Sequence, residues 1–124
     1  MRIDVVTLFP ELVDAVAQHG VVGRAIGSGI ASLHSWQLRD FATDRHRTVD
    51  DAPFGGGPGM VLKAEPVLAA IAAARAAAAE PVRVVYLTPQ GRRFDQAAAC
   101  ELAGRQRLLL LCGRYDGVDE RAAE

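Results

Sequence analysis

The stretch Ile3-Asp4-Val5-Val6-Thr7-Leu8-Phe9, which Pro10 ends, decides the fold. It is largely apolar and β-branched, which is typical of a strand buried in a parallel sheet. Pro10 and Glu11 then favour a helix, because proline suits the first helical turn and an acidic side chain suits the positive end of the helix dipole. The apolar face of that helix would consist of Leu12, Val13 and Val16.

Further elements alternate along the chain. A short helix over residues 22–28 would end at Gly29 in a left-handed cap, and the alternating polarity of residues 30–38 predicts a second strand. The other predicted elements are helices over residues 63–80 and 95–103, strands over residues 82–87 and Arg107–Cys112, and a last helix that begins at Asp119. This order predicts one α/β domain, a mostly parallel sheet flanked by helices.

Two details of this pattern bear on the core and on the site. We expect the helix over residues 63–80 to turn Val67, Leu68 and Ile71 toward the core. Residues 39–60 show no periodicity, and a long segment of this kind in a compact domain is usually functional or mobile.

Composition limits the class of protein. Across 124 residues the formal net charge is −1, which argues against a protein whose whole surface binds nucleic acid. Two cysteines make neither a disulfide framework nor a zinc site, and the apolar run before Cys112 favours a buried thiol. The first residues show no basic segment followed by a long apolar stretch, so we expect no signal peptide, and no apolar run reaches the length of a membrane span. We therefore expect a cytoplasmic protein without a membrane partner.

Two common nucleotide-binding motifs are absent. The loop after the first strand, residues 9–12, has no glycine with which to approach a phosphate, whereas a dinucleotide-binding enzyme has G-x-G-x-x-G there. The chain also has no Gly-Lys-Ser/Thr sequence, so a P-loop is missing. These absences argue against dehydrogenases, Rossmann-type methyltransferases and P-loop ATPases.

The first glycine-rich loop spans residues 50–60, Asp-Asp-Ala-Pro-Phe-Gly-Gly-Gly-Pro-Gly-Met. It can be a tight connection between a strand and a helix. The three consecutive glycines Gly55, Gly56 and Gly57 favour the other interpretation, a backbone that contacts a ligand closely.

The second loop is Gly113-Arg114-Tyr115-Asp116-Gly117, which follows a buried strand. Its glycines permit a close approach to a ligand, and Asp116 can accept hydrogen bonds; the alternative is a surface loop with an Arg–Asp pair. The turn 87–91 leaves the preceding strand in the same way. Because ligands of parallel sheets bind at the carboxyl ends of strands, the two turns together predict an adenosine pocket.

A basic stretch, Arg45, His46 and Arg47, lies in the long aperiodic segment among several aspartates. It is either a solvated loop whose charges cancel or a set of contacts to nucleic-acid phosphates. No cluster of histidine, cysteine and carboxylate residues has the spacing of metal ligands, so we predict no metal site from the residues.

The N-terminal strand with Pro10, residues 50–60 and residues 112–121 together resemble the bacterial tRNA (guanine-N1)-methyltransferases of the SPOUT class, and the resemblance spans the chain. It implies a sheet tied in a trefoil knot and a homodimer. It also implies methyl transfer from S-adenosylmethionine to N1 of the guanine 3′ to the anticodon (position 37) of tRNA. Magnesium is associated with the family, although no ligand set is readable here.

By position, the cofactor-binding set of that family corresponds to Leu87, Thr88, Pro89, Gly113, Tyr115 and Gly117. The set that faces the tRNA corresponds to Arg45, His46, Arg47, Asp50 and the glycines Gly55, Gly56 and Gly57. Asp116 stands where the family usually has a glutamate, and its implied catalytic role is auxiliary.

The resemblance also implies that much of such an enzyme lies outside residues 1–124. Family members are about twice as long, and their remainder holds the second cofactor loop, the general base, a catalytic arginine and the C-terminal tRNA-binding domain. We therefore expect a partial N-terminal SPOUT domain with an incomplete knot and no activity of its own. The rival hypothesis is a non-catalytic module that binds a nucleotide or mediates dimerisation.

Overall fold

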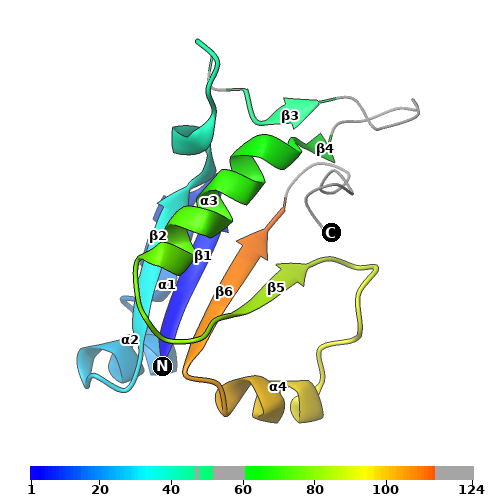
Figure 1. The fold of residues 1–124 in the computed structure, drawn as a ribbon. Coiled ribbons are helices and arrows are strands. Elements are labelled where there is room, and N and C mark those ends of the chain that lie inside the picture. The colour runs from blue at the N-terminus through cyan, green and yellow to red at the C-terminus, as the bar shows by residue number, and fades with distance from the viewer. Residues whose placement is uncertain (47, 52–60, 114–124) are drawn as a thin grey trace.

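The computed structural model describes residues 1–46, 48–51 and 61–113, without the side chains of residues 50, 51 and 61. Figure 1 shows the arrangement of the helices and strands. In chain order these are β1 (Arg2–Thr7), α1 (Pro10–Val16), α2 (Gly20–Gly27), β2 (Ser32–Gln37), the 3-10 helix η1 (Leu38–Phe41), β3 (Asp50–Asp51), β4 (Val61–Leu62), α3 (Ala64–Ala76), β5 (Arg83–Leu87), α4 (Gln96–Ala103) and β6 (Arg107–Cys112).

The main sheet has four parallel strands in the order β2-β1-β6-β5. The two apolar strands that the sequence singles out, β1 and β6, are its centre, with Val5 opposite Leu110. The predicted α/β class and the parallel sheet are therefore confirmed. All four strands end at one edge, which Figure 1 shows on the side of the β3–β4 hairpin.

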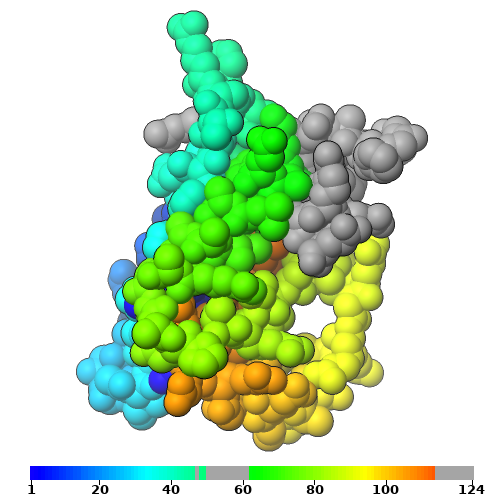
Figure 2. All heavy atoms as spheres, viewed as in Figure 1, coloured from blue at the N-terminus to red at the C-terminus, as the bar shows by residue number. Residues whose placement is uncertain are grey.

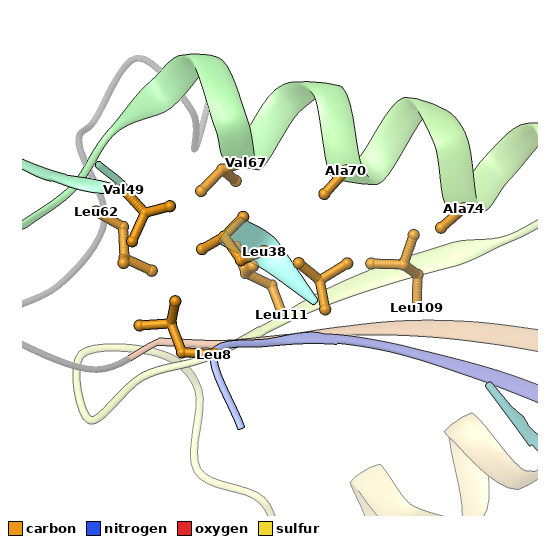
Figure 3. Close-up of a cluster of buried hydrophobic side chains, with 10 residues drawn as sticks. Leu8, Leu38, Val49, Leu62, Val67, Ala70, Ala74, Leu109 and Leu111 are labelled. Carbon is orange, nitrogen blue, oxygen red and sulfur yellow. The ribbon is translucent and has the colours of Figure 1, made fainter. Parts of the chain in front are cut away.

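Helices cover both faces of the sheet. On one face α3 packs against alternate residues of the central strands, and the cluster includes Val6, Leu109 and Leu111 (Figure 3). The other face of β5 and β6 meets α4, where Val85 and Leu110 line a small apolar hollow with Leu102. Helix α1 packs on β1 and β2, behind the sheet in the view of Figure 1.

Helix α3 corrects one of the predicted core residues. Val67, Ala70 and Ala74 are fully buried, whereas Leu68 is 47% exposed, so the expectation that Leu68 faces the core is wrong. Positions 67, 70 and 74 follow the helical repeat and form one stripe, and residue 68 is turned about 100° away from it. Ile71 packs at the border of the stripe, as expected. The helix ends at Ala76, before the predicted residue 80.

Helices α1 and α2 form where the sequence predicts them, but their aliphatic side chains are largely in solvent. No residue of α1 is buried, and Leu12 and Val16 are 66% and 55% exposed. Helix α2 begins at Gly20, two residues earlier than predicted. Gly29 has a φ of 83°, which confirms the left-handed conformation that the sequence predicts at the end of this helix.

The segment over residues 39–60 is more regular than the sequence suggests. Leu38 begins the 3-10 helix η1, and β3 pairs with β4 in antiparallel register, Asp50 opposite Leu62. Leu38, Val49 and Leu62 are all fully buried beneath α3, which places the described ends of the segment in the core (Figure 3). The expectation of a segment without elements is therefore wrong for these residues.

A buried ion pair lies at the other end of α3, between the two central strands. Arg107 of β6 donates from Nε to Oδ2 of Asp4 on β1 at 2.9 Å, and both side chains are fully buried. Asp4 also accepts from Arg2 at 3.1 and 3.2 Å and from the indole of Trp36 at 3.0 Å. Its two oxygens therefore have four hydrogen bonds, which offset the cost of removing the charge from water.

The rest of the Arg107 guanidinium caps α3. Nη1 donates to the carbonyl oxygens of Arg75 and Ala78, and Nη2 donates to that of Ala74. Carbonyl groups in the last turn of a helix have no partner within the helix, and the dipole gives that end a partial negative charge. No glycine follows α3 to form a left-handed cap, so a cation from a distant strand supplies the cap instead.

These contacts set the titration of Asp4. Burial raises the pKa of its carboxyl group, but the hydrogen bonds from Arg2, Trp36 and Arg107, with the charge of Arg107, outweigh burial and hold that pKa below its usual value. A carboxyl whose pKa is lower in the folded state stabilises the fold above its unfolded pKa, which is about 3.9. This stabilisation is lost as the pH falls through the folded pKa.

We predict that Asp4→Asn lowers the free energy of unfolding by about 3–5 kcal/mol at neutral pH, because Arg107 stays buried without a countercharge. The variant should also lose part of the decline in stability below about pH 4. Urea unfolding followed by circular dichroism across pH measures both effects. The control is Asp14→Asn, at an exposed residue; it should keep the acid dependence, since Asp4 remains. If the stability of Asp4→Asn declined at low pH as much as that of the unsubstituted protein, the prediction would be contradicted.

Candidate functional site

At the carboxyl edge of the sheet, local hydrogen bonds pair the polar groups that follow β1 and β2. Thr7 Oγ1 accepts from the amide of Phe9 at 3.0 Å. The side chain of Gln37 donates to the carbonyl oxygen of Leu8 at 3.2 Å and accepts from the amide of Arg39 at 3.2 Å. These bonds pair the polar groups of Thr7, Leu8 and Gln37 where the two strands end. The candidate site is therefore the other half of the edge, over β5 and β6.

The ends of β5 and β6 lie side by side, with Leu87 opposite Cys112 in the ladder. The next residue, Gly113, lies against the ring of Tyr86: a Cβ built on this glycine would be 3.3 Å from Tyr86 Cε1. The sequence predicts that the turn 87–91 lies beside the loop that starts at Gly113, and the described part of both turns confirms it. Sequence reasoning missed Tyr86, because the contact depends on the register of β5 and β6.

The turn after β5 has a defined conformation. Thr88 Oγ1 accepts from the amide of Gln90 at 3.2 Å, and the carbonyl oxygen of Thr88 accepts from the amide of Gly91 at 3.4 Å. Leu87 at its start is 50% exposed, an unusual position for a leucine at the end of a strand. Leu87, Thr88 and Pro89 thus present apolar surface beside backbone polar groups, a combination that is common in small-molecule pockets.

A hollow of about 660 Å³ adjoins this turn, between β5, the segment that follows it and α4. Its lining includes Tyr86, Leu87, Thr88, Pro89 and Phe94. Figure 2 shows the opening between the yellow segment and β5. Leu87 and Phe94 also line a second, apolar hollow of about 370 Å³ on the sheet face next to α4. Leu87 and Phe94 thus lie between two hollows on the β5 side of the edge.

The segment predicted to face nucleic acid lies above the same edge in Figure 1. Arg45 and His46 are exposed in a turn. This turn is held by Asp44, whose Oδ1 accepts from the amide of Thr48 at 2.7 Å, and that bond holds the pKa of Asp44 below its usual value. Asp50 lies on β3, whose strand partner β4 leads directly into α3.

Several residues predicted for the site lie outside the described residues, and the structure does not place them. They are Arg47, Gly55, Gly56, Gly57, Tyr115, Asp116 and Gly117. The last predicted helix, from Asp119, also lies outside the described residues. Cys112, predicted to be a buried thiol, is only partly buried, and burial raises the pKa of its thiol.

Within residues 1–46, 48–51 and 61–113, no three histidine, cysteine or carboxylate side chains are grouped so as to hold a metal ion. None of the helices in the same ranges has the length and apolar character that crossing a membrane requires.

We predict that Gly113→Ala destabilises the fold by about 1 kcal/mol or less, because its methyl group lies 3.3 Å from Tyr86 Cε1 and the half-buried ring has to shift by a few tenths of an ångström. The same change in a Tyr86→Ala background should cost much less, since the obstructing ring is absent. Urea denaturation of the four proteins of this double-mutant cycle measures the coupling. Additive effects would show that the close approach of Gly113 and Tyr86 has no energetic consequence.

Comparison with known proteins agrees with this geometry. The family model described as "tRNA (Guanine-1)-methyltransferase TrmD" matches residues 1–124. The tRNA (guanine-N(1)-)-methyltransferases of Klebsiella pneumoniae (strain 342) and Salmonella typhimurium (strain LT2) are 55% and 56% identical over 124 residues, which is 100% of this chain and 49% of each relative.

A solved structure gives the same result. The crystal structure of tRNA (m1G37) methyltransferase from Aquifex aeolicus superposes with a TM-score of 0.86 at 36% identity, covering 98% of this chain and 55% of that one. The chain thus spans about half the length of the curated relatives it matches. With the family model matched from end to end, and with the turns after β5 and β6 side by side, the chain belongs to the tRNA (guanine-1)-methyltransferase family.

Proposed function

We propose that residues 1–124 are the N-terminal half of an enzyme that transfers a methyl group from S-adenosylmethionine to N1 of the guanine 3′ to the anticodon of tRNA. The observation that supports this most directly is the pair of adjacent strand ends, Leu87 beside Cys112, in a chain of this family. The adenosine of the donor would lie over the ends of β5 and β6, between Leu87–Pro89 and Gly113, and Tyr115 and Gly117 would complete the pocket.

The chemistry explains why this half needs further groups. N1 of guanine holds a proton at neutral pH, so its methylation requires a base at N1 and a donor or cation at O6. Asp116 would assist as an auxiliary acceptor. The general base and the catalytic arginine would come from outside residues 1–124, so we expect this chain alone to be inactive.

The tRNA would approach from the β3–β4 side of the edge. Arg45 and His46 are exposed there, and guanidinium groups are well suited to hydrogen-bond phosphate oxygens. Together with Arg47 they would position the anticodon stem, while Asp50 and the glycines Gly55, Gly56 and Gly57 would face the target nucleotide. A tRNA substrate also suits the cytoplasm, where we place the protein.

Transfer of tritiated methyl groups to unmodified tRNA tests this function. We expect transfer by the enzyme at the length of its relatives and none by residues 1–124. In the longer form, Leu87→Ser should weaken S-adenosylmethionine binding about tenfold, since it removes apolar surface from the donor pocket. Leu68→Ser is the matched control: Leu68 is exposed to nearly the same extent, 47% against 50%, but lies on α3.

Titration calorimetry with S-adenosylmethionine measures the binding of both variants. Normal turnover by residues 1–124 would contradict the proposed division of the site between two halves. Tight binding of a different nucleotide by residues 1–124, without methyl transfer by the longer form, would favour the non-catalytic module.

We further propose that the enzyme is a homodimer and that α1 and α2 contribute to the contact between subunits. Four aliphatic side chains of these two helices are 45–72% exposed: Leu12, Val16, Val21 and Val22. Monomeric proteins rarely leave such a group of large aliphatic side chains in water, and self-association would bury it.

We expect the double variant Leu12→Glu/Val16→Glu to be monomeric in analytical ultracentrifugation, because a charge cannot be buried unpaired in an interface. The control Leu68→Glu places the same charge on an exposed leucine of α3 and should stay dimeric. A monomeric unsubstituted enzyme, or a dimeric double variant, would refute this interface.

A further inference from the structure

One end of α3 is held by hydrogen bonds from a charged side chain in addition to packing. Arg107 donates to the carbonyl oxygens of Ala74, Arg75 and Ala78, and the same guanidinium is bound to Asp4 in the centre of the sheet. Arg and Asp are both fully buried, and β1 and β6 fix their backbones. The last turn of α3 is therefore attached to a rigid point of the sheet.

The other end of α3 is joined to the β3–β4 hairpin. Val67 in the first turns of the helix, Leu62 on β4 and Val49 just before β3 are all fully buried in one cluster (Figure 3). The amide of Lys63, which precedes α3, donates to the carbonyl oxygen of Val49 at 2.6 Å. The hairpin and the start of the helix thus share one buried cluster and one backbone hydrogen bond.

The side of α3 that meets the sheet has mostly small buried side chains. After Val67 its buried residues are Ala70 and, in the last turn, Ala74, whose methyl groups make shallow ridges. Axial position between packed helices and sheets is normally set by large side chains that fit into grooves. Helix α3 has 13 residues and is about 20 Å long. We infer that the ionic attachment at its last turn sets the axial position of the helix.

We propose that Arg107, held by Asp4, is a positioning residue: through α3 it sets the place of the β3–β4 hairpin over the carboxyl edge of the sheet. The inference rests on the proposed function insofar as the hairpin faces the tRNA. Arg107 does not touch the substrate in this account. Its effect should appear in tRNA binding and not in binding of the methyl donor, because Leu87 and Gly113 lie at the ends of β5 and β6, which are paired with each other in the sheet.

The test uses the substitution Arg107→Lys in the enzyme at the length of its relatives. Lysine keeps the charge beside Asp4 but lacks the planar fork that reaches three carbonyl groups at once. By hydrogen exchange, we expect the Lys63 amide to exchange about tenfold faster, while amides of β1 and β6 keep their rates. Asp4→Glu, which moves the carboxylate by one methylene, should change the same amide. Arg105→Lys, at an exposed arginine nearby, is the control and should change neither.

Kinetics provide the second readout. In Arg107→Lys we expect KM for tRNA to rise about tenfold, with KM for S-adenosylmethionine unchanged. An unchanged Lys63 amide, equal loss of protection in all strands, or a variant that does not fold would show a role in stability alone and overturn the proposal. If the unsubstituted protein transfers no methyl group, the proposed function fails, but the hydrogen-exchange result still decides whether Arg107 positions the hairpin.

Discussion

The ion pair between Asp4 and Arg107 is the contact on which the arrangement of the described helices and strands depends. It links the two central strands, residues 103 positions apart, and the same guanidinium closes the last turn of α3. A buried ion pair is rarely the most stabilising choice, since an apolar pair of the same size avoids the loss of hydration. The ion pair has another advantage, because its hydrogen bonds are directional. They fix one register of β1 against β6 and one position of α3, which contacts between methyl groups do not specify.

Stability and binding are separated along the strands. The amino ends hold the Asp4 network, and the carboxyl ends hold the turns after β5 and β6 that are open to a ligand. A parallel sheet allows this division because all its strands start at one edge and end at the other. Over β1 and β2 the polar groups of this edge are bonded to Thr7 and Gln37, whereas a hollow lies beside Leu87 over β5. In the proposed function the donor lies over β5 and β6, and the tRNA meets the β3–β4 hairpin.

Local patterns were sufficient to predict most of the fold. The apolar β-branched residues of β1 and the leucines of β6 identify buried strands, and their alternation with helices gives the parallel sheet. The prediction for Leu68 is wrong because alanine is common on both the buried and the exposed face of this helix. The buried stripe of residues 67, 70 and 74 therefore cannot be recognised from the sequence. The Asp4–Arg107 and Tyr86–Gly113 contacts could not be predicted either: each depends on strand register, which local periodicity does not contain. The glycine loops suggested the site, and the neighbouring ends of β5 and β6 support its donor side.

The strand order has a consequence for biosynthesis. Strand β1 has two partners. Strand β2 begins about thirty residues after the start of β1, whereas β6 begins about a hundred residues later and is the last strand among the described residues. A ribosome adds roughly 5–20 residues each second, so the nascent chain holds β1 with one side unpaired for several seconds. During that interval the carboxylate of Asp4 lacks Arg107 and stays hydrated. Strand β6 has to insert between β1 and β5, which are both synthesised before it. Pairing between residues so far apart in the sequence gives a high contact order. A high contact order favours slow folding and leaves the unpaired strands exposed to aggregation meanwhile.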